Sequence, residues 1–178
     1  MAFIYNYWKN ALGAAQDSGD PDTVHVYWVD TAMVNSLEKY RILLVNTTST
    51  ADTEFNVTTI TGTNPTTGGG SAFSNLQEYR AGPYPDNGYD RKVLTTRTVT
   101  AAAGPGGTAF YKSAGVSYTS LIQNGSTTVK GGVVYRASNN ATVNNQEGVP
   151  LIFADVAFAP NGTNVTITWP SSNVWSIT

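Results

Sequence analysis

The stretch Leu151-Ile-Phe-Ala-Asp-Val-Ala-Phe158 decides the fold class, together with two similar runs on either side of it. Val133-Val-Tyr135 precedes this stretch, and Val165-Thr-Ile-Thr-Trp169 follows it. β-branched and aromatic residues suit a pleated surface, and alternation of apolar and polar residues places every second side chain on one face. Residues typical of turns separate the runs, among them Pro160-Asn-Gly162. We therefore predict that residues 131–178 form an antiparallel meander of strands.

Shorter runs of the same kind recur upstream and are separated by segments rich in glycine, proline and asparagine. They cover Tyr40–Val45, Glu54–Ile60, Tyr89–Thr100, Thr108–Lys112 and Val116–Ile122. Many short strands with turn signals between them are typical of β-sandwiches and jelly rolls. A chain of 178 residues also suits one domain. We predict that residues 1–178 form a single all-β domain, an antiparallel β-sandwich resembling a jelly roll.

The beginning of the chain has a different periodicity. Over residues 3–15, the apolar side chains recur at intervals of three and four, which draws one stripe along a helix. The segment Asp17-Ser-Gly-Asp-Pro-Asp22 would then end that helix. We expect a short N-terminal helix within residues 1–16, either packed on the β-domain or contacting a partner.

Composition limits the classes of partner. Charged residues make up 12% of the chain, about half the share usual in globular proteins, and the net charge is −2. The charges form no basic run, so we expect no nucleic-acid partner. No stretch approaches the ~20 apolar residues that span a bilayer, so we expect no membrane partner. The absence of cysteine excludes disulfides and thiolate chemistry.

The residues that could carry chemistry are few. His25 is the single histidine, and nothing in the sequence places a serine and an acid beside it, so we interpret it as a packed strand residue. Asp17, Asp20 and Asp22 lack the spacing and the distal glutamate of a calcium loop, which favours a polar turn. We therefore expect a non-enzymatic protein with no catalytic residue, no cofactor and no metal site.

The aromatic residues are numerous for a chain with so little charge. Core packing explains most of them, but some lie beside a loop rich in proline and glycine or in the expected N-terminal helix. Tyrosine and tryptophan in such places are frequent interface anchors. The residues predicted to contact a partner are Tyr5, Trp8, Tyr79, Tyr84 and Tyr89.

Several blocks of the sequence together resemble a known group of proteins. They are Met1-Ala-Phe3, Asp20-Pro-Asp-Thr-Val-His-Val26, Gly88-Tyr-Asp-Arg-Lys-Val-Leu94, Thr98-Val-Thr100, Gly132-Val-Val-Tyr135, Pro150-Leu-Ile-Phe153, Val165–Trp169 and Trp175-Ser-Ile-Thr178. This pattern of strand blocks resembles small virion proteins of tailed bacteriophages, of the capsid decoration or cement type. The similarity covers about two-thirds of the chain, and the region from Asp30 to Ser74 departs from it.

The resemblance implies a function and a location. Such a protein would sit on the capsid surface of the virion, bind the major capsid protein and stabilise its lattice. It would act as a homo-oligomer, with a trimer favoured, and it would have no catalytic residue. The alternative is a carbohydrate-binding or receptor-binding β-module associated with a tail or fibre, which binding to a defined glycan would indicate.

Overall fold

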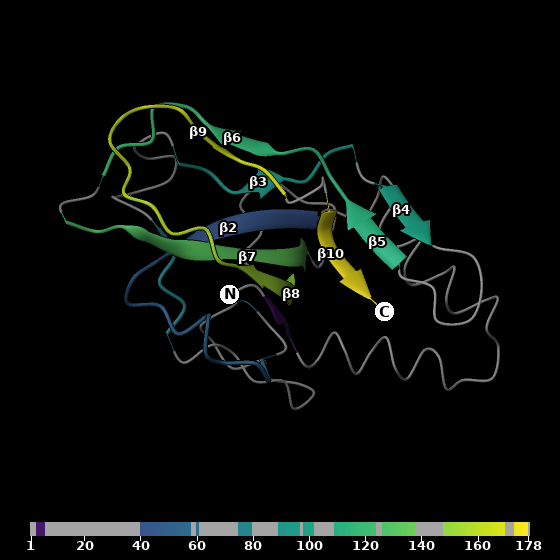
Figure 1. Cartoon of the computed structure of the whole chain (residues 1–178). Helices are drawn as coiled ribbons and strands as arrows, with labels where there is room; N and C mark the ends of the chain where they lie inside the picture. Colours follow the sequence, from purple (N-terminus) through teal and green to yellow (C-terminus); the bar gives the residue numbers. More distant parts are fainter. Residues whose placement is uncertain are drawn as a thin grey trace.

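The computed structural model describes residues 3–5, 40–57, 60, 75–79, 89–96, 98–101, 109–123, 126–137, 148–169 and 173–177 (Figure 1). Within these residues every regular element is a β-strand. The strands are β1 (Phe3–Ile4), β2 (Tyr40–Asn46), β3 (Lys92–Val93), β4 (Thr98–Ala101), β5 (Ala109–Lys112), β6 (Val116–Tyr118), β7 (Val129–Ala137), β8 (Gly148–Ala154), β9 (Val165–Ile167) and β10 (Asn173–Ile177).

The largest sheet has five strands in the order β1-β8-β7-β2-β3, and all neighbours in it are antiparallel. Its strands β2 and β7 lie side by side near its centre (Figure 1). All but the last residue of β2 are buried. A strand that is buried on both faces reads as a continuous apolar run, as Ile42 to Val45 do.

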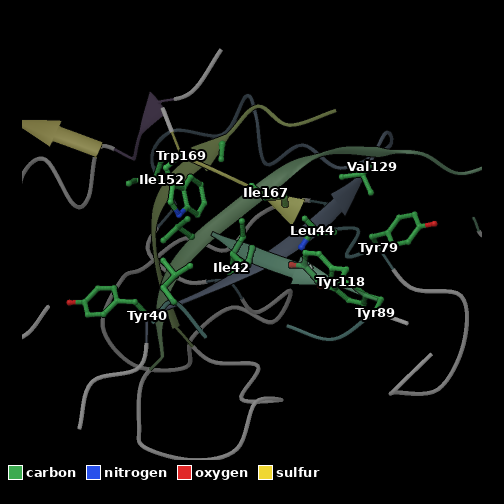
Figure 2. Packing of buried hydrophobic residues seen from close by; sticks show 14 of the residues in the cluster. Tyr40, Ile42, Leu44, Tyr79, Tyr89, Tyr118, Val129, Ile152, Ile167 and Trp169 are labelled. Carbon is green, nitrogen blue, oxygen red and sulfur yellow. Dashed lines mark hydrogen bonds between the residues drawn. The ribbon is translucent and has the colours of Figure 1, made fainter. Parts of the chain in front are cut away.

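Successive residues of β2 enter two separate clusters of buried side chains. Tyr40, Ile42 and Leu44 belong to the first cluster, which Figure 2 shows, whereas Leu43 and Val45 belong to the second. Successive side chains of a strand point to opposite faces of the sheet, so neighbouring residues of β2 enter different clusters. The sheet is therefore covered by side chains on both sides.

A β-bulge lets β8 place two consecutive residues against the same cluster. The register of β7 with β8 shifts between Val134 and Tyr135, so that Val134 pairs with Ile152 and Tyr135 with Pro150. Leu151 is the extra residue, and it shares the first cluster with Ile152. A bulge of this kind breaks the strict alternation of the pleat and re-aims the side chains next to it.

Two smaller antiparallel sheets accompany the main one, in the orders β10-β5-β4 and β6-β9. Every second residue of the β6–β9 pair points into the first cluster, where Val116, Tyr118 and Ile167 pack with the side chains of β2 and β7. On the other face of the main sheet, Tyr5, Ala51, Val57 and Ile60 pack with the side chains of the second cluster. The prediction of an all-β fold with antiparallel sheets is confirmed for the described residues.

The closing meander was predicted from local pattern and is wrong in its pairing. β7 and β8 do form neighbouring strands, but β9 pairs with β6, and β10 pairs with β5. A period of two identifies a strand without specifying its partner, because pairing depends on contacts distant in sequence. The last third of the chain thus contributes to all three sheets.

Three further expectations for individual elements need correction. Phe3–Ile4 is a strand paired with β8, so the predicted helix is wrong at its first residues, and its remainder lies outside the described residues. The strand expected at Glu54–Ile60 is absent from the described residues of that range, where Phe55 and Asn56 lie in a turn. The long strand expected from Tyr89 to Thr100 is divided into β3 and β4, which belong to different sheets. Thr96, with a φ of 51°, lies between them.

Candidate functional site

The most polar part of the described interior is an ion pair between Glu78 and Arg91. Nε and Nη2 of Arg91 donate to Oε1 and Oε2 of Glu78, each at 2.7 Å. The side chains are 5% exposed for Arg91 and 11% for Glu78, so water screens this pair little. A bidentate pair has the geometry that matches a guanidinium to a carboxylate. It joins the segment 75–79, which bridges to β2 at Val45, to the start of β3.

Two tyrosines complete this cluster. The Tyr89 hydroxyl donates to Oε1 of Glu78 at 2.7 Å and accepts from the backbone N–H of Leu44 at 3.1 Å. Nη1 of Arg91 donates to the Tyr135 hydroxyl at 3.4 Å, and its guanidinium carbon lies 5.6 Å from the centre of that ring. The cluster therefore links β2, β3, β7 and the 75–79 segment through side chains.

The environment shifts the pKa values of these groups. Burial raises the pKa of Tyr89 well above its ordinary value, and the charge of Glu78 raises it further. For Arg91, burial alone would lower the pKa, but the hydrogen bonds and the charge of Glu78 outweigh it and raise the pKa. Tyr89 thus stays neutral and Arg91 stays charged at ordinary pH. Arg91 donates a hydrogen bond to each carboxylate oxygen of Glu78, so the pair links the 75–79 segment to the start of β3.

Three buried tyrosines, Tyr79, Tyr89 and Tyr118, pack against one another next to this cluster, and Figure 2 shows them. The ring of Tyr89 stacks on Tyr118 with centroids 5.8 Å apart and meets Tyr79 edge-on at 6.0 Å. The Tyr79 hydroxyl donates to the carbonyl of Ile122 at 2.8 Å. Nζ of Lys92 lies 5.4 Å from the Tyr118 ring centre and forms an ion pair with Asp90. These rings connect the main sheet to the β6–β9 pair.

A second set of polar contacts lies on the other side of the main sheet. Nζ of Lys130 donates to Oδ1 of Asp52 at 2.7 Å and to the carbonyl of Ser49 at 2.8 Å. The Tyr5 hydroxyl donates to the carbonyl of Ala51 at 2.7 Å. These bonds fix the turns after β2 onto β7 and onto the start of the chain.

The structure corrects the predicted role of three of the aromatic residues. Tyr5 is 0% exposed, and Tyr79 and Tyr89 are each 1% exposed. Their rings fill the core and their hydroxyls bind groups of this same chain, which leaves no surface for a partner. We therefore assign these three tyrosines to the core. Trp8 and Tyr84 lie outside the described residues, and their interface role stays a prediction.

Other residues considered from the sequence also fall outside the described part. His25 and the aspartates at 17, 20 and 22 are among them. In the described ranges, no three histidine, aspartate or glutamate side chains gather where they could hold a metal ion. No helix of the described chain is long and apolar enough to cross a membrane.

Several exposed residues of the described part carry hydroxyl groups. They include Ser117 in β6 and Thr166 in β9, and Thr119 and Thr168, which each lie just beyond one of these strands. The two large apolar residues exposed in the described part are Phe55 and Ile122, at 44% and 51%. Strict alternation from buried Val116 and Tyr118 would place Ile122 on the buried face, so its exposure could not be predicted from the pattern. The alternation ends at Thr119 and Ser120, which are both exposed.

The Glu78–Arg91 pair was also missed. Its two residues are thirteen positions apart and lie on either side of a loop rich in proline and glycine. The usable signal was that Glu78 is the only acid between Asp52 and Asp86 other than Glu54. This signal does not identify Arg91 as the partner, because Arg80 is closer in sequence and Arg91 lies between Asp90 and Lys92. The contact depends on how distant segments pair.

Comparisons with protein-family models, with curated proteins and with solved structures found no match to this chain.

Proposed function

We propose that this chain is a non-enzymatic structural protein of a tailed-bacteriophage virion, a decoration or cement protein of the capsid surface. Its major partner is the major capsid protein, whose assembled lattice it stabilises. The whole chain acts as one domain, a β-sandwich of the jelly-roll type in which the β6–β9 pair covers one face of the main sheet. The proposal starts from the resemblance of the strand blocks to such proteins.

The observation that carries the proposal is the burial of the main sheet on both faces. β2 and β7 contribute to two clusters of buried side chains, one on each side of the sheet. A domain built in this way resists deformation, because neighbouring side chains on both faces are close-packed. Resistance to deformation is what a protein needs in order to hold neighbouring lattice subunits in place.

The distribution of charge supports the same role. The described part contains ion pairs within the chain, Glu78–Arg91, Asp90–Lys92 and Asp52–Lys130, so these charges offset one another. The strand residues that the described part shows as exposed, Ser117 and Thr166, both carry hydroxyls. Such a surface forms many polar contacts whose strength depends little on salt.

The mechanism is selective binding. A protein that binds the assembled lattice and does not bind free coat subunits stabilises the assembled state by RT ln(1 + [L]/Kd). Each bound copy adds buried contacts that must break before subunits separate. No bond of the partner is made or broken.

The test uses purified protein and expanded capsids that lack it. We expect stoichiometric extra density on the capsid surface by electron microscopy and a higher capsid disruption temperature. Capsids that remain bare and unchanged in disruption temperature would contradict the proposal. Binding at the tail together with binding to a defined glycan on an array would replace it with the tail or fibre module.

A further inference from the structure

Two turns of this chain hold an asparagine side chain in the same way. In the turn before β9, Oδ1 of Asn161 accepts hydrogen bonds from the backbone N–H of Thr163 at 3.1 Å and from its hydroxyl at 2.6 Å. At the end of β2, Oδ1 of Asn46 accepts from the backbone N–H of Thr48 at 2.9 Å and from its hydroxyl at 2.8 Å. A backbone N–H can only donate, so the atom that faces it in each turn is the amide oxygen.

Two donors on one amide oxygen change the reactivity of that amide. A nucleophile that attacks the Cγ atom of an asparagine pushes negative charge onto Oδ1, and donors already aimed at this oxygen stabilise the charge as it develops. The nearest nucleophile is the backbone nitrogen of the next residue, whose attack closes a cyclic imide. Both turns therefore favour the charged intermediate, and the residue after the asparagine decides whether attack follows.

That next residue is the difference between the two turns. It is Gly162 after Asn161 and Thr47 after Asn46. The branched side chain of a threonine crowds its own backbone nitrogen, whereas a glycine leaves the nitrogen open to the amide carbon. Gly162 has a φ of 84°, which favours glycine, and a Cβ placed there would meet no atom within 4 Å. Asn161, Gly162 and Thr163 are all exposed, so water reaches this turn.

We propose that Asn161 is a site of self-modification, at which the turn itself promotes deamidation of the side chain. The backbone nitrogen of Gly162 loses its proton to water and forms a bond to Cγ of Asn161. The bond from Cγ to Nδ2 then breaks, and the nitrogen leaves as ammonia after taking up a proton from water. A second water molecule opens the cyclic imide at one of its two carbonyl groups, which yields either aspartate or isoaspartate. The step is a hydrolysis, so it needs no oxidant, reductant or cofactor.

One hydrogen bond of the turn opposes the reaction and makes it slow. The backbone N–H of Gly162 donates to the carbonyl of Leu121 at 2.8 Å, and this bond must open before the nitrogen can attack. The strand pairs of β6 and β9 end at Tyr118 and Val165, so the Gly162–Leu121 bond lies beyond them. Opening of an exposed turn costs far less free energy than global unfolding. The reaction therefore proceeds in the folded chain.

The two products differ in their effect on the fold. Aspartate adds a negative charge but keeps an oxygen that can accept from Thr163. Isoaspartate routes the main chain through the side-chain carbon, which lengthens the backbone next to Gly162. Leu121 exchanges backbone hydrogen bonds with both Gly162 and Thr163, and the longer backbone cannot keep both. The isoaspartate form is therefore expected to unfold at a lower urea concentration than the native chain.

The experiment incubates the purified, folded chain at mildly alkaline pH and follows each asparagine by peptide mass spectrometry, with chromatography to separate the aspartate and isoaspartate peptides. It uses no coat protein, so its result is independent of the capsid role. We expect Asn161 to convert while Asn46 and Asn164 stay unmodified over the same time. Asn164 is a second internal control, because its Oδ1 accepts from the backbone N–H of Ser120 at 3.0 Å but Val165 follows it.

Substitutions of Thr163 test the contribution of its hydroxyl. Thr163→Val keeps the shape of the side chain without the hydroxyl, and we expect it to slow the conversion of Asn161 about fivefold. Loss of an oxyanion donor costs more in an enzyme site that excludes water, and this turn is exposed. Thr163→Ser should restore the rate. In urea the turn is lost, so Asn161 should react equally fast in the native and Thr163→Val chains. Circular dichroism checks that the variants are folded.

Three results would overturn the proposal. The first is that Asn161 in the folded native chain reacts no faster than Asn46 and Asn164, a comparison that holds even if a variant does not fold. The second is that folded Thr163→Val reacts as fast as the native chain. The third is that the two chains differ as much in urea as they do when folded, because the residue type and not the turn would then set the rate.

Discussion

Arg91 holds both carboxylate oxygens of Glu78, with two hydrogen bonds of 2.7 Å in an interior where neither side chain is more than 11% exposed. The two residues come from segments that share no strand pairing with each other, the 75–79 segment and the start of β3. Their contact therefore ties together two parts of the fold that, among the described residues, backbone hydrogen bonds join through β2. The stability of the main sheet near β3 depends on this side-chain link.

Replacing Arg91 by methionine is expected to lower the free energy of unfolding by about 3–5 kcal/mol, because it removes two short hydrogen bonds and a positive charge from the buried Glu78 carboxylate. The double change Arg91→Met with Glu78→Met should recover a large part of this loss. Urea denaturation of the single and double variants measures the coupling. The control is Lys130→Met, which breaks the Asp52 pair.

In that control pair the side chains are 29% and 27% exposed, so the expected loss is at most about 1 kcal/mol. If Arg91→Met and Lys130→Met lower the free energy of unfolding by the same amount, the buried ion pair is no more important for stability than the half-exposed one.

Tyr118→Phe is expected to stabilise the protein by about 1 kcal/mol. The Tyr118 hydroxyl is fully buried and has no hydrogen-bond partner in the part of the chain that the structure describes. Removing a buried polar group without a partner removes its desolvation cost, while the ring still stacks on Tyr89. The midpoint of chemical denaturation measures the change.

Tyr79→Phe is the matched control, since Tyr79 is almost equally buried but its hydroxyl donates to the carbonyl of Ile122. Removing this hydroxyl leaves the carbonyl without its donor and should cost about 1 kcal/mol. If Tyr118→Phe and Tyr79→Phe change the stability in the same direction, the hydrogen bonding of the hydroxyl does not determine the sign of the change.

Local pattern was enough to predict most of the strands. β5 and β9 fall within the runs predicted at Thr108–Lys112 and Val165–Trp169. The runs predicted at Tyr40–Val45 and Val133–Tyr135 lie inside the longer strands β2 and β7. The prediction failed for Phe3–Ile4, because a two-residue strand is too short for any periodicity and is defined by its pairing with β8. It failed for the partner of β9, because pairing with β6 joins residues that are distant in sequence, such as Val116 and Ile167.

Contacts between residues distant in sequence also explain why Tyr79 and Tyr89 are buried and not exposed as predicted. Tyr79 and Tyr89 flank a loop rich in proline and glycine, which made exposure a reasonable expectation. A tyrosine suits either a surface or a core, provided that its hydroxyl finds a partner. In this chain Glu78 and the carbonyl of Ile122 supply those partners, and neither contact follows from residue spacing. The low charge of the described surface, by contrast, follows from composition alone.

Unfolding is expected to become easier as pH rises above about 10, because three buried tyrosines resist ionisation in the folded state. Burial raises the pKa of Tyr5, Tyr89 and Tyr118, and nearby carboxylates raise it further: Asp52 and Glu54 for Tyr5, Glu78 for Tyr89, and Asp90 for Tyr118. The unfolded chain releases these protons near the ordinary pKa and the folded chain retains them. Stability is therefore complete below about pH 10 and falls as pH rises.

Each of these tyrosines contributes a slope of up to about 1.4 kcal/mol per pH unit between its unfolded and folded pKa values. Urea denaturation at several alkaline pH values measures the slope, and Tyr118→Phe should reduce it by one such contribution. A stability that is constant up to the pH where arginine titrates would contradict the expectation.

Gly131→Ala is expected to destabilise the protein more than Gly132→Ala, although the two residues are neighbours in β7. A Cβ at Gly131 would lie 2.7 Å from the backbone oxygen of Ala154 and would also meet the ring of Phe153. Relief would require β7 and β8 to separate, so we expect a loss of about 2–3 kcal/mol, at the upper end of overpacking effects.

At Gly132 the nearest atom to a new Cβ is Cδ1 of Ile42, at 2.7 Å, which is the flexible end of a side chain. Rotation of that side chain relieves the contact, so the loss should be about 1 kcal/mol. Thermal and urea denaturation of the two variants give the comparison. Because alanine replaces glycine in the same strand in both, differences in strand propensity nearly cancel, and the remaining difference measures how tightly the backbones of β7 and β8 approach each other. A larger loss at Gly132 than at Gly131 would contradict this close approach.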